Sequence, residues 1–333
     1  MAKTVNGAFD VFLRDTVNLD PEQTNKARSS RDWLVGQIQS FSVGDDKFPQ
    51  NYTDKNIFFG SFSRRTKKRP LDDIDIMICL NANGCTYKEL PDKIEINTSK
   101  DSTRFLEYVN EGTNVLNSRK LINAFISKLS KIDQYKKSEI KRNQEAATLN
   151  LTSYDWIFDI VPCFFTAEDA NKKTYYIIPD GSGNWKKTDP RLDNERLVNV
   201  NSKHNGNVLN VIRAVKYWNN RPTMPTMPSY LLENMILEYY SERSTPASQY
   251  VDVELVNIFN DIYTRVYKVV NDPKGIQGNL NKLTAEEKKK ISDRALVDYK
   301  KAKEARIFET ENKQSDSINK WKEIFGDKFP KYE

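Results

Sequence analysis

The chain of 333 residues is 38% hydrophobic, 29% charged and 11% aromatic, a composition typical of about two folded domains and not of a disordered chain. A single histidine excludes His-rich metal sites, and three cysteines without CxxC spacing exclude a zinc ribbon and a disulfide framework, so carboxylates must supply any acid, base or metal-binding chemistry. The net charge of +6 fits anionic substrates such as nucleotides, and the lack of a leader and of a membrane-spanning apolar run indicates a cytoplasmic protein without a membrane partner.

The first third of the sequence changes from helical to strand periodicity. Apolar residues at helical spacing predict two helices within residues 8–42, the second of which begins at Asp20-Pro21. The segment IFFGSF is then expected to form a short strand that ends at Gly60-Ser61. After a basic run, the alternating segment DDIDIMICL predicts a second strand.

Further strands and helices follow in an order that indicates a mixed α+β protein. We expect a helix over 114–132 and strands over 138–151 and 156–165, the last one closed by Pro162. A connection rich in Gly, Asn and Lys covers 179–190, and helical periodicity dominates from residue 207 onward. The charged stretch 283–327 predicts one long surface helix and a shorter one. The strands and N-terminal helices are therefore assigned to a domain over 1–200, and the remaining helices to a domain over 201–333.

Two carboxylates lie two residues apart on the second predicted strand. The pleat places Asp73 and Asp75 on one face, whereas Asp72 has the opposite parity and precedes the strand proper. Adjacent carboxylates repel each other unless a cation lies between them, and oxygen ligands of this kind select Mg²⁺ or Mn²⁺. The pair therefore predicts a divalent cation site.

The strand over 156–165 carries a third carboxylate, Asp159, which could approach the first pair from a neighbouring strand. Asp155 has the same parity and is the alternative. The turn at Gly60-Ser61 can offer backbone amides and a hydroxyl to phosphate oxygens. Three carboxylates beside a phosphate-binding turn are typical of a phosphoryl-transfer site with two metal ions.

The order and spacing of these motifs resemble the DNA polymerase β-like nucleotidyltransferases. Within this superfamily, Gly60-Ser61, the Asp73 pair and FDIVPCF most resemble the branch that contains the 2′-5′-oligoadenylate synthases, cyclic GMP-AMP synthase and the bacterial cGAS/DncV-like (CD-NTase) enzymes of anti-phage defence. The resemblance selects Asp159 as third aspartate, because the family's aspartate directly precedes an apolar-Pro element. It also implies a polymerase β-like catalytic sheet with flanking helices over 1–200, and a helical domain over 201–333 that closes over the active-site cleft.

The segment over 211–240 resembles the family's helical-domain signature. By that likeness Lys216 would contact the donor triphosphate, Ser229 would add a hydroxyl to it, and Tyr230 would stack on a nucleobase. Stacking on an aromatic face tolerates any base. The likeness therefore predicts nucleotide contacts but not which base is bound.

The basic run between the Gly-Ser turn and the aspartate pair has two interpretations that stay open. It is either a mobile loop that faces phosphates, with Arg64 and Thr66 nearest the turn and in contact with nucleotide, or solvated surface. His204 is interpreted as a loop or cap residue and not as a catalyst, and Cys79 and Cys163 as small buried side chains.

The resemblance implies a nucleotidyltransferase that uses two Mg²⁺ or Mn²⁺ ions per site. Asp73, Asp75 and Asp159 would hold both ions, and ATP and GTP or other ribonucleoside triphosphates would be joined into a cyclic di- or trinucleotide messenger for a separate effector. A cyclic GMP-AMP isomer is favoured by family frequency alone. A linear 2′-5′ oligonucleotide synthase, an RNA-end nucleotidyltransferase and a silent binding scaffold are the alternatives. The sequence does not favour a nucleic-acid activator, and a monomer is expected.

Overall fold

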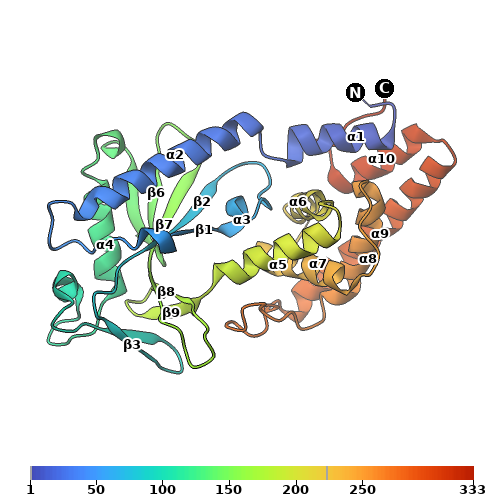
Figure 1. Cartoon of the computed structure of the whole chain (residues 1–333). Helices are drawn as coiled ribbons and strands as arrows, with labels where there is room; N and C mark the ends of the chain where they lie inside the picture. The colour runs from blue at the N-terminus through green and yellow to red at the C-terminus, as the bar shows by residue number, and fades with distance from the viewer. Residues whose placement is uncertain (1, 223) are drawn as a thin grey trace. The chain divides into compact units, whose positions relative to one another are not determined.

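The computed structural model describes residues 2–222 and 224–333 and has the expected α+β architecture (Figure 1). Contacts between Cα atoms divide the chain into two compact units, which are described separately. The sheet unit comprises Glu22–Arg64 and Leu71–Arg191. The helical unit comprises the N-terminal residues up to Pro21, Arg65–Pro70 and Leu192–Glu333. Among the described residues, no helix combines the length and the apolar character needed to cross a membrane.

The sheet unit is built on a sheet of nine strands, with β2 and β7 as parallel neighbours near its centre. The main path of the sheet runs β1-β2-β7-β8-β9-β4-β3, while β6 pairs with both β7 and β5. The strands are β1 (Ile57–Phe59), β2 (Asp73–Cys79), β3 (Thr86–Glu89), β4 (Ile94–Asn97), β5 (Glu139–Asn143), β6 (Ala146–Asn150), β7 (Ile157–Phe165), β8 (Tyr176–Pro179) and β9 (Trp185–Thr188).

Three helices accompany the sheet: α2 (Pro21–Gln39), the single turn α3 (Gly60–Ser63) and α4 (Ser118–Leu129). Figure 1 shows α2 and α4 beside the part of the sheet that contains β6. The helix α4 begins later than expected, because the Asn117 side chain accepts hydrogen bonds from two backbone amides of its first turn. Such an N-cap ends the irregular segment before it.

The helical unit has one core to which both ends of the chain contribute. Phe9 packs edge-on against Trp321, with ring centroids 5.0 Å apart, and Phe12 packs against Phe325 at 4.9 Å. Ala2 also pairs with Tyr332 in a short bridge. The helices are α1 (Val5–Phe12), which continues as a π-helix over Leu13–Val17, α5 (Pro190–Lys203), α6 (Val208–Asn219), α7 (Ser229–Glu242), α8 (Val251–Arg265), α9 (Ala285–Thr310) and α10 (Gln314–Phe325).

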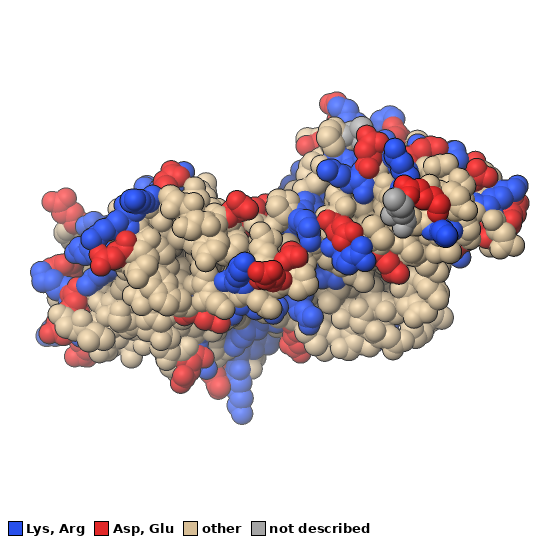
Figure 2. All heavy atoms as spheres, turned by 90° about the horizontal axis from the view of Figure 1, so that it is seen from above, with Lys and Arg blue, Asp and Glu red and all other residues tan. Residues whose placement is uncertain are grey.

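The predicted long and short C-terminal helices are confirmed as α9 and α10. A capping box of Thr284 and Glu287 starts α9, and ion pairs such as Lys290 with Glu286 follow its exposed face. Its other face contributes Ile291 and Ala302 to the core. Figure 2 shows acidic and basic side chains interspersed on the face that it draws, which is the pattern of a solvated surface.

The structure differs from the expected strands in two places. The single strand expected over 138–151 is a hairpin, because the chain turns at Gln144 with a φ of 51°. Pro162 does not close β7, which continues to Phe165. On the side of β7 that faces β6 and β8, β6 pairs with β7 only as far as Ile160, and β8 pairs with it only from Phe164. Proline is tolerated between them because neither strand needs a backbone donor from Pro162.

Four short strands, β3, β4, β8 and β9, were not expected from the sequence, and β9 lies inside the expected connection over 179–190. The division of the chain differs from domains over 1–200 and 201–333. The residues up to Pro21 pack in the helical unit because the aromatic residues of α1 belong to its core. The sheet unit ends at Arg191, since α5 already packs with the helices.

Candidate active site

Three aspartates lie on one face of the central strands. Asp75 and Asp159 are direct neighbours in the register of β2 and β7, and Asp73 lies two residues earlier on β2, opposite Ile157. All three are half-buried, whereas the alternating residues, such as Ile74, are buried on the other face. The parity predicted from the sequence is thus present in the sheet.

Asp72 and Asp155, the alternatives considered above, precede the two strands. The backbone carbonyl of Asp72 accepts a hydrogen bond from the Ile157 amide at 2.9 Å, so this residue helps to start the β2–β7 pairing. Asp155 is exposed. Neither residue shares the strand positions of Asp75 and Asp159.

A threonine that the sequence analysis did not identify holds Asp159. Thr148 lies opposite Asp159 in the antiparallel register of β6 and β7, and its hydroxyl donates a hydrogen bond of 2.6 Å to Asp159 Oδ1. Thr148 is buried. Hydrogen bonds to an ionised carboxylate are shorter and stronger than neutral ones, so Thr148 restrains the position of this carboxylate. No local pattern identifies the residue, because its role depends on the hairpin register.

The Gly-Ser turn lies directly against the aspartate pair. Phe59 is opposite Asp75 in the register of β1 and β2, and Gly60 follows with a φ of 70°. A Cβ atom on Gly60 would lie 2.6 Å from Asp75 Cγ, closer than real Cβ atoms approach. Only glycine therefore fits, both for the left-handed backbone and for the contact with the carboxylate. Ser61 is half-buried in the same turn, and the amide of Arg64 closes it on the Gly60 carbonyl at 3.2 Å.

The donor chemistry of this face fits a hard divalent cation, because carboxylate oxygens on neighbouring positions are the ligands that Mg²⁺ and Mn²⁺ prefer. In residues 2–222 and 224–333, no group of three or more His, Cys, Asp or Glu side chains is arranged to hold a metal ion. The register of the strands places Asp73, Asp75 and Asp159 on one face of the sheet.

Two further candidates, Thr66 and Lys216, meet in a buried network of the helical unit. Lys216 Nζ donates to Glu233 Oε2 at 2.7 Å and to the Thr66 carbonyl at 3.3 Å, and the Thr66 hydroxyl donates to the same Glu233 oxygen at 2.9 Å. All three side chains are buried. The sequence analysis did not anticipate Glu233, an acidic residue on an otherwise apolar helix face.

Residues of the basic run make hydrogen bonds within the helical unit. The Arg65 carbonyl accepts from Arg213 at 2.9 Å, and Arg69 donates through its backbone amide to Val17 and through Nε to Asn18. Burial lowers the pKa of Arg213 to about 10, with a smaller contribution from the charge of Arg65.

Tyr230 is held by charged neighbours at the start of α7. Its hydroxyl donates to Asp193 Oδ1 at 2.6 Å, and the Lys274 ammonium lies 4.3 Å from the centroid of its ring. Burial raises the pKa of Tyr230, and the hydrogen bond to Asp193 raises it further. Ser229 is exposed as the first residue of α7.

The candidate residues thus form two groups. Gly60, Ser61, Arg64 and the three aspartates belong to the sheet unit, and Thr66, Lys216, Ser229 and Tyr230 belong to the helical unit.

The lone histidine and the cysteines have structural surroundings. His204 lies in the turn between α5 and α6, fully buried, where Nδ1 accepts from the Ala247 amide and Nε2 bonds the Tyr240 carbonyl. Cys79 and Cys163 are buried neighbours on β2 and β7, and burial raises the pKa of the Cys163 thiol. These positions agree with the roles expected from the sequence.

Comparison with known proteins identifies full-length and partial relatives, although no protein-family profile matches the chain. A probable cyclic nucleotide synthase of Bacillus cereus strain VD146 is 48% identical over 335 residues, which cover all of both chains. A probable cyclic AMP-AMP-GMP nucleotide synthase of Salmonella paratyphi B and a cyclic AMP-AMP-GMP synthase of Enterobacter hormaechei are each 27% identical, over 46% of this chain and 42% of the relative.

Solved structures share the fold along nearly the whole chain. Escherichia coli MS115-1 CdnC with ATP aligns with a TM-score of 0.68 and 16% identity, over 97% of this chain and 98% of CdnC. Escherichia coli DncV in its 3′-deoxy GTP bound form aligns with a TM-score of 0.65 and 12% identity, over 98% and 95% of the two chains. With a full-length relative at 48% identity and the fold of CdnC and DncV, the chain belongs to the bacterial cGAS/DncV-like nucleotidyltransferase (CD-NTase) family and is a nucleotidyltransferase.

Proposed function

We propose that the protein joins ribonucleoside triphosphates into a cyclic di- or trinucleotide second messenger and releases pyrophosphate. The observation that carries this proposal is the register of β2 and β7, which places Asp75 beside Asp159 with Asp73 two residues away. The full-length relative is named as a cyclic nucleotide synthase, which supports a cyclic product. We further propose that the enzyme acts as a cytoplasmic monomer in bacterial anti-phage signalling.

The proposed cofactor is Mg²⁺ or Mn²⁺, with two ions held by Asp73, Asp75 and Asp159. Such ions, when bound, favour ionisation of the attacking hydroxyl and neutralise charge at the phosphorus. The residues of this chain hold the reactants: the Gly60-Ser61 turn offers backbone amides and a hydroxyl to phosphate oxygens, and Thr148 keeps Asp159 in place.

The substrates are proposed to be ATP and GTP. CdnC was solved with ATP and DncV with a deoxy GTP, and both share the fold of this chain. In the helical unit, Lys216 and Ser229 would contact the triphosphate and the Tyr230 ring would stack on a base. Arg64 of the sheet unit and Thr66 of the helical unit are also proposed to contact nucleotide.

We propose a cyclic GMP-AMP isomer as the product. The competing product is cyclic AMP-AMP-GMP, after which two partial relatives are named. Both products use the same two purine triphosphates and differ in ring size and mass, so a single assay separates them.

The test is incubation of the purified protein with labelled ATP, GTP, CTP and UTP and either Mg²⁺ or Mn²⁺, followed by phosphatase and mass spectrometry. A phosphatase-resistant species with a cyclic di- or trinucleotide mass is expected, and it should be absent with Asp73→Asn and without divalent cations. A ladder of linear products would replace the proposal by a linear oligonucleotide synthase. A product that persists in Asp73→Asn would refute the assigned site.

A further inference from the structure

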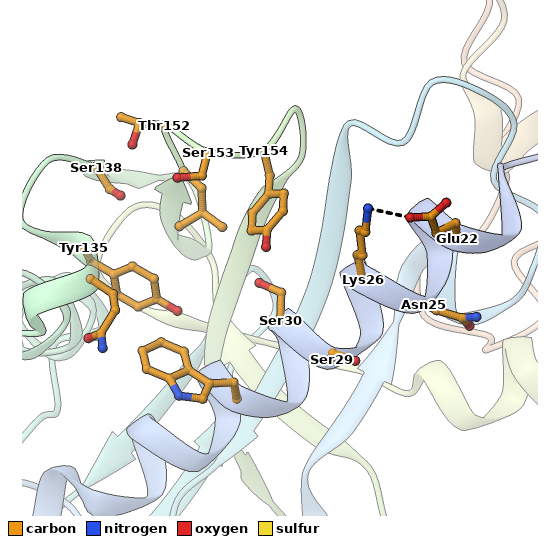
Figure 3. Close-up of a pocket in the computed structure, with 13 residues that line it drawn as sticks. Glu22, Asn25, Lys26, Ser29, Ser30, Tyr135, Ser138, Thr152, Ser153 and Tyr154 are labelled. Carbon is orange, nitrogen blue, oxygen red and sulfur yellow. Dashed lines mark ion pairs between the residues drawn. The ribbon is translucent and has the colours of Figure 1, made fainter.

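A pocket of about 610 Å³ lies in the sheet unit (Figure 3). It is bounded by α2, by the segment that precedes β5, and by residues 151–154, which connect β6 to β7. This volume lies within the range of sites that bind small molecules. None of the residues assigned above to nucleotide or metal binding lines it.

Aromatic side chains form much of the pocket wall. Trp33 and Tyr154 are 39% and 42% exposed, so both rings are accessible to a ligand in the pocket that they line. Both rings are supported from behind: Trp33 packs edge-on against Tyr135 at 5.5 Å, and Tyr154 stacks on Trp156 at 4.3 Å. Rings held in this way offer preformed surfaces to a planar ligand at low entropic cost.

The Tyr135 hydroxyl is a polar group that lacks a partner. The side chain is 4% exposed, and its oxygen has no hydrogen-bond partner among the described residues. Figure 3 shows this hydroxyl pointing away from Ser138 and toward the side of the pocket where Ser30 lies. Because a buried, unsatisfied hydroxyl is destabilising, its presence beside a pocket points to a ligand that supplies the missing partner.

Apart from Leu151, the rest of the lining is polar and has no net charge. Five serine and threonine side chains and two amides line the pocket, and they can bond the edge of a ring that contains nitrogen and oxygen. The two charged lining residues, Glu22 and Lys26, are paired with each other at 2.7 Å. This charge balance does not match a phosphate group, so it argues against a nucleotide.

We propose that this pocket binds an uncharged planar heteroaromatic molecule of about the size of a nucleoside. The ring stacks against Trp33 and Tyr154, and an acceptor atom receives the Tyr135 hydroxyl. The site is independent of the proposed synthase reaction. It does, however, contact the segment that joins the strand of Thr148 to the strand of Asp159, so its occupancy can influence the active site.

The test is calorimetric titration of the full-length protein with adenosine, guanosine, cytidine and uridine, none of which can act as a phosphoryl donor. At least one nucleoside is expected to bind with a dissociation constant below about 1 mM. Trp33→Ala should weaken that binding by about tenfold or more. Tyr52→Ala is the matched control, since Tyr52 is an equally exposed aromatic residue of the sheet unit outside the pocket and should not change binding.

Two more variants separate ligand binding from folding. Ser29→Arg places a long side chain in the pocket from an exposed helical position, where arginine is a better helix former than serine, and should abolish binding. Tyr135→Phe should weaken binding severalfold while the free protein melts at the same or a higher temperature. The proposal is overturned if no nucleoside binds, or if Trp33→Ala and Ser29→Arg leave binding unchanged. Neither result bears on synthesis of the cyclic product, which the phosphatase assay measures separately.

Discussion

Replacing Gly60 by alanine tests whether the turn after β1 is shaped around the Asp75 carboxylate. An alanine Cβ would lie 2.6 Å from Asp75 Cγ, and the φ of 70° lies in the left-handed region. The backbone conformation costs an alanine roughly 1 to 2 kcal/mol, and crowding in a packed site adds roughly 1 to 3 kcal/mol. Gly60→Ala is therefore expected to lower the free energy of unfolding by about 2 to 5 kcal/mol.

Gly112 provides the matched control, because it has the same φ of 70° but a Cβ atom at that position would meet no other atom within 4 Å. Gly112→Ala should cost only the backbone term of roughly 1 to 2 kcal/mol and leave activity unchanged. Because the clash must displace the Asp75 carboxylate, Gly60→Ala should reduce product formation by about 100-fold. Urea unfolding and the phosphatase assay measure the two quantities. Equal stability and equal activity of the two variants would refute the reasoning.

Three further predictions concern other contacts of the two units. Thr148→Val removes the hydrogen bond to Asp159 and should reduce product formation by about tenfold. It should also raise the Mg²⁺ concentration needed for half-maximal activity. Thr148→Ser keeps the hydroxyl, and in the same Mg²⁺ titration it should restore the rate and the half-maximal concentration. Lys216→Met leaves the Glu233 carboxylate buried without the Lys216 ammonium and should lower the free energy of unfolding, measured in urea, by about 3 to 5 kcal/mol. The double variant Lys216→Met with Glu233→Met should be more stable than Lys216→Met alone. The hydrogen bond from Lys128 lowers the pKa of Asp45 to about 2. The ionised carboxylate therefore stabilises the fold above its unfolded pKa, and this contribution is lost as the pH falls from about 4 toward 2. In acid unfolding, the stability of Asp45→Asn should not show this loss between about pH 4 and 2.

Some elements of the site could be predicted because their signals are local. The alternation of Asp73, Ile74 and Asp75 is a property of one strand, and the parity follows from the pleat wherever the strand lies in the sheet. The long helix α9 has a capping box and paired charges, which are also local. These features need no knowledge of tertiary contacts.

Other elements could not be predicted because they depend on partners distant in sequence. Thr148 acquires its role only when the hairpin register places it opposite Asp159. Tyr230 is held by Asp193 and Lys274, which come from separate segments of the chain. The missed strands β3 and β9 have four residues each, too few for a periodic pattern to distinguish them from loop.

The shared core of the two chain ends has a consequence for how the protein is made. Phe9 leaves the ribosome long before Trp321 is synthesised, so α1 cannot complete its aromatic packing until nearly the entire chain has been made. The sheet unit needs nothing beyond Arg191 and can assemble earlier. Contacts of such long sequence separation form slowly. A nascent or truncated chain would therefore carry the aspartates on a finished sheet without the helical unit that contains Lys216 and Tyr230. If the proposed roles of these two residues hold, such unfinished chains would be inactive.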